Sequence, residues 1–478
     1  MTAIIWFRRD LRLADHPALV SALSERCPVV PFFCLDTALL SGRFRSSARA
    51  AFMFDCLREL NTGLRTLGSA LVLRSGDPVT ELLKLVRETG AATVHASADS
   101  GPYARRRDLH AAEQLTQEGV RLRGHPGLFA ASDLSRLRTA DGQPFQVFTP
   151  FYKAWLRAPR RKVLAAPGAL PPLPSGISSE DPARVLSPAR FQQPGAALPV
   201  SLPRGGARAG YERFAEFRDG PLAGYADGHD DLSTEGTSRL SPYLHFGCIS
   251  PRQIESELPD GDGPEAFRRQ LAWRDFYAQV LREFPADARE EHQPRYRKTI
   301  EWSNDAEAFA CWRAGRTGFP LVDAGMRQLA LEGWMHNRAR LVTGSFLTKD
   351  LGIDWRWGER HFMELLLDGD VCNNNGNWQW IASVGVDPQP VSRRILSPSR
   401  QQARFDPSGA YVRRYVPELH AVPDAYLAEP WLMPASVQQT CGCVIGKDYP
   451  APIIDRPIAR KAALERYRAA AAAAAAQE

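Results

Sequence analysis

Thirteen residues hold most of the candidate chemistry of this chain. Residues 368–380 read Asp-Gly-Asp-Val-Cys-Asn-Asn-Asn-Gly-Asn-Trp-Gln-Trp. Asn, Asp and Gly compete with the hydrogen bonds of a helix, so this composition is not typical of one. Residues 359–367 have the apolar spacing of a helix that would deliver the cluster of carboxylates and amides to one point. A polar heterocyclic ligand would suit the cluster, and an Asn-rich surface turn beside two core tryptophans explains it equally well.

Tryptophan is concentrated in the same region. Seven of the chain's eleven tryptophans lie between positions 302 and 380, and Trp273 stands just upstream. An indole is bulky, and its N–H needs a partner when it is buried. This concentration indicates stacking surfaces or an electron path in addition to core packing.

Length and composition predict a globular protein of two or three domains. A chain of 478 residues with 44% apolar and 24% charged residues is too long for a single core. Its formal net charge of +6 is compatible with a phosphate-binding face without proving one. The eight cysteines are scattered, with no second pair at metal-ligand spacing, so we expect free thiols in the cytosol and no metal site. No run approaches eighteen apolar residues and no signal-peptide pattern opens the chain, so we expect neither secretion nor a membrane span.

The elements that would position these residues change along the chain. Strands are predicted at the apolar runs 3–7, 29–35, 70–73 and 92–96, with helices at 46–67 and 77–89 between them. This alternation predicts a doubly wound parallel sheet, which binds ligands at the carboxyl ends of its strands. Arg8, Arg9 and Arg12 follow the first strand, and we favour salt bridges within the domain over ligand contact for them.

A Pro-rich stretch and a helical half follow. Residues 158–206 are Pro-rich and are not expected to bury a core of their own, so they should run along the protein surface. Amphipathic helices are predicted at 267–284, 321–331, 338–351 and 359–367, and eight alanines at 469–476 predict a frayed helix. We therefore divide the chain into an α/β domain (1–130), a linker (131–206), a helical domain (207–468) and an Ala-rich tail (469–478).

Five motifs in the second half resemble the DNA photolyase and cryptochrome family. In order they are TSRLSPYL (237–244), WRDFY (273–277), TGFP (317–320), GWMHNR (333–338) and the run 368–380. The opening WFRRDLR (6–12) extends the resemblance to nearly the whole chain. It implies an α/β antenna domain followed by a helical domain that binds FAD and DNA, most like a bacterial class I cyclobutane pyrimidine dimer photolyase.

The residues themselves leave the first motif open. Thr237, Ser238 and Ser241 put three hydroxyls near a predicted helix start, which by itself reads as an ordinary N-cap. The resemblance implies instead that they hold the FAD pyrophosphate. By the same resemblance the cofactor-binding residues are Tyr225, Thr237, Ser238, Arg239, Leu240, Ser241, Phe267, Arg274, Asn337, Arg340, Asp368, Gly369 and Asp370.

Two further roles near the flavin are implied by the resemblance. Asn374 should face the flavin N5, and an amide does not readily deliver a proton, so it suits a reduced, anionic flavin. Trp378, Trp355 and Trp302 match the family's electron-transfer chain from flavin to surface, and they can be core aromatics at the same time.

The lesion site is assigned in the same way. Trp273 and Trp380 match the two indoles that line the pocket for a flipped-out dimer, where stacking is worth about 1–3 kcal/mol per base. The DNA-binding residues implied are His229, Trp273, Arg338, Trp380, Arg394 and Gln401. Gln270 stands where many members place a Glu that contacts the dimer, and a solvated helix residue is the alternative. Asn337 and Leu341 occupy the positions of the two histidines of (6-4) photolyases, so that chemistry is not expected.

Photolyases also hold a second, light-harvesting chromophore near the first domain. Folate-binding members carry an Asn-Glu pair after the fourth strand, and residues 101–108 lack it. A deazaflavin or FMN is therefore favoured over folate, and no antenna at all stays open.

The sequence thus predicts light-dependent DNA repair by a deoxyribodipyrimidine photo-lyase. Reduced FAD would pass an electron to a flipped-out cyclobutane dimer, and a cytoplasmic monomer would act on UV-damaged DNA with no membrane and no obligate protein partner. A cryptochrome-type photoreceptor is the first alternative, opposed by Asn374 and by the lack of a long polar extension. A flavoprotein that only shuttles electrons is the second, and it would not need both Trp273 and Trp380.

Overall fold

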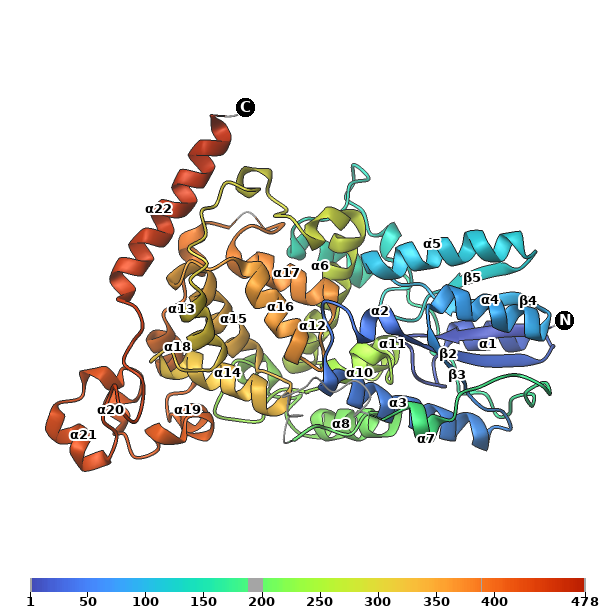
Figure 1. Ribbon diagram of the computed structural model, residues 1–478, viewed down its shortest axis with the longest axis horizontal. Coiled ribbons are helices and arrows are strands. Elements are labelled where there is room, and N and C mark those ends of the chain that lie inside the picture. The colour runs from blue at the N-terminus through green and yellow to red at the C-terminus, as the bar shows by residue number, and fades with distance from the viewer. Residues whose placement is uncertain (1, 188–200, 388, 477–478) are drawn as a thin grey trace.

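Five parallel strands form the sheet of the first part of the chain (Figure 1). The computed structural model describes residues 2–187, 201–387 and 389–476. The strands are β1 (Thr2–Phe7), β2 (Val29–Asp36), β3 (Val72–Gly76), β4 (Ala91–Ser97) and β5 (Arg121–His125), in the order β3-β2-β1-β4-β5. The four predicted strands and the parallel doubly wound arrangement are confirmed.

The fifth strand escaped the sequence-based prediction. β5 lies at the sheet edge and pairs with β4 alone. Its residues Arg121 and Gly124 are exposed, and its other residues are half-buried. An edge strand of this kind carries no continuous apolar run, which is the pattern that identified the other four.

The two faces of the sheet are covered by different helices. The connecting helices are α1 (Pro17–Ser24), α2 (Thr37–Leu40), α3 (Ser47–Thr66), α4 (Pro78–Thr89) and α5 (Pro102–Gln117). Along β1, Ile4 and Trp6 pack in a core with α4 and α5, whereas Ile5 and Phe7 pack in a second core with α1 and α3. Alternate strand residues point to opposite faces, which accounts for this division.

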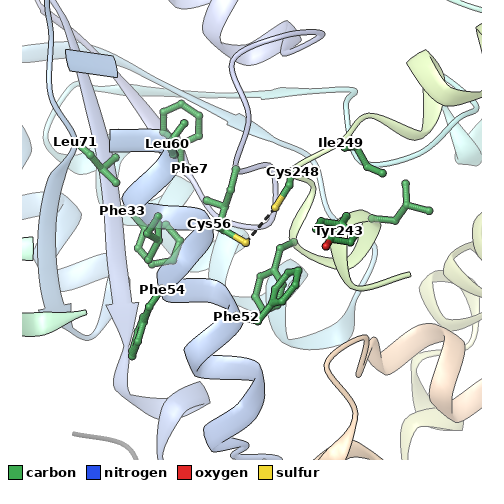
Figure 2. Packing of buried hydrophobic residues seen from close by; sticks show 14 of the residues in the cluster. Phe7, Phe33, Phe52, Phe54, Cys56, Leu60, Leu71, Tyr243, Cys248 and Ile249 are labelled. Atoms are coloured by element: carbon green, nitrogen blue, oxygen red, sulfur yellow. Dashed lines mark hydrogen bonds between the residues drawn. The ribbon is translucent and has the colours of Figure 1, made fainter. Parts of the chain in front are cut away.

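Helix α3 joins the sheet to the helical half. Phe52 and Cys56 of α3 lie between strand residues such as Phe33 and the helical-half residues Tyr243 and Cys248 (Figure 2). The Phe52 and Tyr243 rings are 5.2 Å apart in an edge-to-face contact, and the Cys56 and Cys248 sulfurs are 3.2 Å apart. A single apolar core therefore spans both halves and holds them in one arrangement.

The Pro-rich segment is tied to the α/β part. The Leu170 N–H donates to the Leu67 carbonyl at 2.7 Å, and the Glu180 N–H donates to the Leu73 carbonyl at 2.8 Å. Short helix α7 (Pro182–Val185) then buries Val185 in the core of α3. Before it, helix α6 (Phe148–Arg157) packs on the helical half. Residues 188–200 of the predicted linker lie outside the described residues.

Helices joined by loops and short 3-10 turns make up the rest of the described chain. They are α8 (Ala207–Asp219), α9 (Tyr225–Gly228), α10 (Ser241–Phe246), α11 (Pro251–Ser256), α12 (Asp262–Glu283), α13 (Ala306–Arg313), α14 (Pro320–Glu332), α15 (Asn337–Ser345), α16 (Trp355–Leu365), α17 (Val371–Ala382), α18 (Pro398–Phe405), α19 (Ala410–Tyr415), α20 (Asp424–Leu427), α21 (Ala435–Cys441) and α22 (Arg456–Ala475). The prediction of an α/β part followed by a helical part is confirmed. The exact domain boundaries stay a prediction.

One predicted helix differs in its second part. The expected helix 338–351 is α15 up to Ser345 and then a π-helical turn over Phe346–Asp350. The chain turns away at Gly352, whose φ of +66° lies in the left-handed region that favours glycine. The turn buries Lys349 and Asp350, two residues that an amphipathic pattern would place on the surface.

The last helix leads away from the body of the protein (Figure 1). α22 packs against the π-helical turn and buries Tyr467 and Ala470, and residues 469–475 of the predicted tail continue this helix. Residues 477 and 478 lie outside the described part. Among the described helices, none combines the length and the hydropathy needed to cross a membrane.

Candidate functional site

One cavity of about 450 Å³ lies between α9, α10, α12, α15, α16 and α17. The predicted site residues that line it are Tyr225, Thr237, Ser238, Arg239, Leu240, Ser241, Phe267, Gln270, Trp273, Arg274, Asn337, Arg340, Asp368, Asp370, Asn374, Trp378 and Trp380. The predicted residues outside its lining are His229, Trp302, Arg338, Trp355, Gly369, Arg394 and Gln401. Small-molecule sites typically occupy about 300–1,000 Å³, so the cavity is of ligand size.

The stretch 368–380 is mostly helix, contrary to the expectation from its composition. α17 begins after Asp370, whose carboxylate accepts from the Asn373 backbone N–H at 2.9 Å as the N-cap. The Asn374 amide donates to the Glu359 carbonyl at 3.0 Å, and the Asn375 amide donates to the Glu359 carboxylate at 3.3 Å. These side chains compete with a helix only when they have no other partner, and here α16 supplies one.

Asp370 also anchors an ion-pair network between the two halves of the chain. Its carboxylate pairs with Arg9, and Arg9 pairs with Asp99 at 2.7 Å. Burial by itself raises the pKa of Asp370, but the charges of Arg9 and Arg274 and the bond from the Asn373 N–H outweigh burial and hold the pKa well below its usual range. The carboxylate is therefore ionised and fixed at the start of α17.

The three arginines after β1 take different roles. Arg8 pairs with Asp108 at 2.5 Å, within the α/β part as predicted. Arg9 has one partner there and one in the helical half. Arg12 is buried and donates to the Gly247 carbonyl at 3.0 Å. Two of these side chains thus connect the halves, which sequence spacing could not reveal.

Asp368 and Arg340 form a second charged pair on the cavity wall. Arg340 contacts Asp368 Oδ2 at 2.9 Å and donates to the Met335 carbonyl at 2.8 Å. Gly369, next in the chain, lies behind the wall. A Cβ there would meet Arg49 Nη1 at 2.5 Å, so the absence of a side chain lets Arg49 donate to the Leu366 carbonyl at 2.8 Å.

The hydroxyl-rich loop before α10 is held from behind. Arg213 donates to the Thr237 carbonyl at 3.1 Å and to the Ser238 carbonyl at 3.0 Å. Arg239 adopts a φ of +52° and pairs with Glu332 at 3.0 Å. With the Thr237 and Ser238 carbonyls held by Arg213, both residues line the cavity together with Ser241.

Several lining residues were not predicted as site residues. They are His245, Tyr277, Trp334 and Asn373 among others. These four lie inside one of the five motifs or directly after it, so position in a motif was the available signal for them. Burial, followed by the charge of Arg9, lowers the pKa of His245 to about 3 and keeps this imidazole neutral.

Two family models of known proteins match this chain, and one of them covers most of the residues that line the cavity. Residues 3–174 match the family model for DNA photolyase, and residues 267–469 match the model for the FAD binding domain of DNA photolyase. The deoxyribodipyrimidine photo-lyase of Streptomyces griseus is 43% identical to this chain over 98% of it and 99% of its own length. The chain belongs to the DNA photolyase family.

Solved structures of this family share the whole fold. A class III photolyase from Agrobacterium tumefaciens has 34% identity and a TM-score of 0.90, with 98% of this chain and 97% of its own covered. A cryptochrome from Synechocystis has 29% identity and a TM-score of 0.87, with 97% and 98% covered. The fold is therefore shared by proteins named as photolyases and by one named as a cryptochrome.

The cavity of this photolyase fits FAD by the chemistry of its wall. Asp368 Oδ1, His245 Nδ1 and Arg239 Nε are buried and have no hydrogen-bond partner among the described residues. Buried polar groups of native proteins are normally paired, so these three atoms on the cavity wall fit a polar ligand. The helical half is thus an FAD-binding domain with both hydroxyl and carboxylate contacts to offer. Among the described residues, no group of three or more His, Cys, Asp or Glu side chains could hold a metal ion.

The two indoles expected at the lesion are both held in place. The Trp273 ring stacks on Phe148 with centroids 3.7 Å apart and planes within 5°. The Trp380 N–H donates to Asp387 at 3.2 Å, and Arg394 lies over the Trp380 ring at 4.2 Å. Both indoles line the cavity, so the photolyase presents two fixed aromatic surfaces there.

Arg394, one of the expected DNA contacts, is buried behind Trp380. Only 2% of it is exposed, and its guanidinium pairs with Asp387 at 2.6 Å and donates to the Trp380 carbonyl at 2.9 Å. Arg394 therefore holds Trp380 from behind, and its role as a DNA contact stays a prediction. Arg338 is half-buried, pairs with Asp230 and lies over Phe405.

The remaining predicted DNA contacts lie beside the cavity. His229 contacts the Tyr225 carbonyl at 2.8 Å and lies 3.9 Å from Asp230, the partner of Arg338. Gln401 is half-buried on α18, and its Oε1 has no hydrogen-bond partner among the described residues. These two residues stay predictions as DNA contacts.

The three tryptophans of the expected chain share one apolar core. Trp378 lines the cavity, Trp355 is fully buried, and Trp302 is half-buried. Trp355 donates to Glu291 at 3.3 Å, and the Trp302 ring lies 6.3 Å from Tyr467 of α22. Trp302, the last of the three in the expected order, is thus the most exposed.

Proposed function

We propose that this photolyase repairs cyclobutane pyrimidine dimers in DNA under blue light. One observation carries the proposal: a single cavity joins the predicted flavin residues around Asn374 to the two fixed indoles Trp273 and Trp380. FAD, when bound and reduced, supplies the electron that opens the dimer. The protein holds the dimer beside the flavin. It also keeps neighbouring groups from giving a proton to the reduced flavin.

Asn374 supports the second of these tasks. Its amide is anchored to the Glu359 carbonyl, and an amide has no acidic proton to give. The buried Glu359 carboxylate, whose pKa burial raises to about 7, is engaged by Asn375 in place of Asn374. Asn374 can therefore orient the flavin by hydrogen bonding while leaving a reduced flavin anionic.

The predicted lesion contacts explain binding of a dimer outside the DNA stack. Phe148 stacks on one face of Trp273 and keeps the indole from rotating away from the cavity. Arg394 holds Trp380 in the same way. A dimer that enters the cavity therefore meets flat apolar surfaces already in place, which lowers the ordering cost of binding. Phosphate contacts such as that expected of Arg338 would add affinity for any DNA.

Substitution of Trp273 tests the lesion pocket. Trp273→Ala should weaken binding to dimer-containing DNA by about 1–3 kcal/mol, because a stacking surface is lost. Undamaged DNA, held through phosphates, should lose much less and keep its salt dependence. Dissociation constants for both DNAs, measured at several salt concentrations, give the comparison. Equal losses on the two DNAs would show that Trp273 serves only the packing of Phe148.

Gln270 is the second test of this pocket. It is exposed on α12 at the cavity, one turn before Trp273 and Arg274, so the three share a helix face. Gln270→Leu should lower the repair yield or weaken lesion binding, because an amide donor to a developing anion is lost. A hydrogen bond to a charged group contributes roughly 1.5–3 kcal/mol. Gln270→Glu should introduce a pH dependence that the parent lacks, since a carboxyl donates only while protonated.

The measurement for Gln270 is repair per absorbed photon across pH for the parent and both variants. Arg269→Gln, also exposed but directed at Phe148 and Tyr152, is the matched control. Repair and binding by Gln270→Leu at parental levels would remove Gln270 from the site.

A cryptochrome-type photoreceptor is the second candidate, because the Synechocystis cryptochrome shares the fold. The two functions differ in one observable, namely whether light removes dimers from DNA. The proposal is tested by the absorption spectrum of the purified protein, which should show a flavin, together with a light-dependent repair assay. The proposal also includes a cytoplasmic monomer that acts on UV-damaged DNA.

An antenna belongs to the proposal as a lesser part. The segment after β4 begins α5 at Pro102, and the Tyr103 hydroxyl donates to Asp36 at 2.5 Å near the carboxyl end of β2. This segment lacks the Asn-Glu pair of folate-binding members, which favours a deazaflavin or FMN over folate. Chromophore extraction and mass measurement would identify it.

A further inference from the structure

Two buried thiols from the two halves of the chain meet beside helix α3. Cys56 lies on α3, and Cys248 lies between α10 and α11, 192 residues further along the chain. Their side chains point toward one another, and the Cys248 thiol donates to the Cys56 sulfur with the sulfurs 3.2 Å apart (Figure 2). Both are free thiols and almost completely buried. Neither lines the cavity, so the proposed repair chemistry does not use them.

The backbone on each side holds the two sulfurs in this arrangement. Cys56 is fixed within the 20-residue helix α3. On the other side, the Cys248 N–H donates to the Tyr243 carbonyl at 3.0 Å, and the Gly247 carbonyl accepts from Arg12 at 3.0 Å. A disulfide bond is about 2.05 Å long, so the sulfurs need to approach by only about 1 Å to form one. Two groups held so close react far faster than two groups free in solution.

A short strap of two glycines covers Cys56. A Cβ on Gly205 would meet the Cys56 sulfur at 2.9 Å and the Phe52 carbonyl oxygen at 2.4 Å, so the strap backbone lies directly against the sulfur. Gly206 is buried as well, whereas Arg204, just before the strap, is exposed. Cys56 therefore lies close to the point where the chain reaches the surface, and neither glycine has a side chain that would block a small molecule.

Burial determines how readily the pair reacts. Burial, followed by the bond from the Cys248 thiol, raises the pKa of Cys56 well above its usual value, and the Gly206 N–H lowers it only in part. The thiolate is the nucleophilic form of cysteine, so a raised pKa slows attack on an oxidant. The pair therefore stays reduced under ordinary conditions and needs an oxidant that is both small and strong.

We propose that Cys56 and Cys248 form a reversible disulfide bond that joins the two halves of the chain when hydrogen peroxide is present. The Cys56 sulfur attacks one peroxide oxygen, the O–O bond breaks, and the thiol proton leaves with the other oxygen as water. The Cys248 sulfur then attacks the sulfur of the resulting sulfenic acid, which forms the S–S bond and releases a second water. The two thiols together lose two electrons and two protons, and the peroxide gains both.

The bond stabilises the docked arrangement of the two halves. It closes a loop between positions that are 192 residues apart, and a disulfide acts mainly by constraining the unfolded chain. The usual gain corresponds to an equilibrium constant for unfolding that is about 30- to 1,000-fold lower. The bond also adds a covalent link to the ion pair between Arg9 and Asp370. Oxidation therefore holds the FAD-binding half on the α/β half more firmly than the reduced pair does.

Peptide mapping of the FAD-loaded protein after exposure to hydrogen peroxide in darkness tests the proposal. The parent should yield a peptide that joins positions 56 and 248, lacks two hydrogen atoms and separates on reduction. The midpoint of urea unfolding should rise on oxidation and return on reduction. Cys56→Ser and Cys248→Ser should lose both effects. Cys34→Ser is the matched control and should keep them, because Cys34 is also buried but donates to the Gly76 carbonyl at 3.7 Å.

The half-buried thiols Cys27 and Cys311 show whether the peroxide has acted. Their oxidation without a peptide joining positions 56 and 248 would overturn the proposal, and so would a sulfinic acid at either position in place of the disulfide. If a serine variant does not fold, as judged by its flavin absorption, the peptide map of the parent decides alone. The experiment uses neither DNA nor light, so failure of the proposed repair function would leave its result unchanged.

Discussion

Trp378→Phe is expected to abolish the light-driven reduction of oxidised FAD while leaving repair by chemically reduced protein unchanged. Trp378 is the only member of the expected chain at the cavity wall among the described residues. It supplies electrons to the flavin and none to DNA, so only the first process needs it. Phe is also far harder to oxidise than Trp and keeps an aromatic ring against Phe362, 5.0 Å away.

The flash-induced kinetics of flavin reduction measure this effect, with dimer repair by dithionite-reduced protein as the second readout. Trp312→Phe is the matched control, because Trp312 is fully buried and contacts Trp378 at 6.3 Å without belonging to the expected chain. Parental kinetics in Trp378→Phe would remove the chain, and equal loss in Trp312→Phe would indicate a packing effect.

Substitution of Asp370 is expected to lower the free energy of unfolding by a large amount. Removing one partner of a buried ion pair costs roughly 3–5 kcal/mol, and the retained Asp99–Arg9 pair places Asp370→Asn at the low end of that range. Asn is as good an N-cap as Asp, so Asp370→Asn removes the charge and keeps the cap of α17. Asp370→Ala removes both and should cost about 1 kcal/mol more. Urea unfolding of the FAD-loaded protein measures the free energies.

Asp305→Asn is the control for this comparison. Asp305 also caps a helix of the same half, α13, but its capping bonds are exposed and Arg9 is not its partner. It should change stability by a few tenths of a kcal/mol at most. A similar small change in Asp370→Asn would mean that the link to Arg9 contributes little.

The pKa shifts at this link also predict acid sensitivity. The lowered pKa of Asp370 makes its contribution fully present above about pH 4 and lost as the pH falls toward the folded value. The pKa of His245 is lowered to about 3 in the folded state. Below about pH 6.5 the unfolded state therefore binds a proton at His245 that the folded state does not bind. Stability should therefore decline below about pH 6.5, and Asp370→Asn should lack the steeper loss below about pH 4.

The parts of the fold that follow from local pattern were predictable. The apolar runs of β1, β2 and β4 and the helical spacing of α3 and α12 depend on neighbours in sequence, and they form as expected. β5 and the π-helical turn at Lys349 carry polar residues whose burial or pairing comes from distant parts of the chain. Local periodicity holds no signal for such residues.

The site divides in the same way. Motif positions identified most of the cavity wall, including Asn374 and the loop at Ser238. The composition of 368–380 argued against a helix because the partner of its amides, Glu359, is supplied by α16. The link from Arg9 to Asp370 crosses 361 residues of sequence and could not be read from spacing. Arg394 matched a family position, but its burial beneath Trp380 could not be predicted from the sequence.

The central claim is that light drives this protein to split dimers. The most direct measurement is the fraction of cyclobutane dimers repaired in a defined oligonucleotide by protein with chemically reduced FAD, under blue light and in darkness. Repair under blue light with none in darkness is the predicted result. Dimers that stay intact under blue light, although reduced flavin is present and the damaged DNA is bound, would contradict repair and favour a photoreceptor.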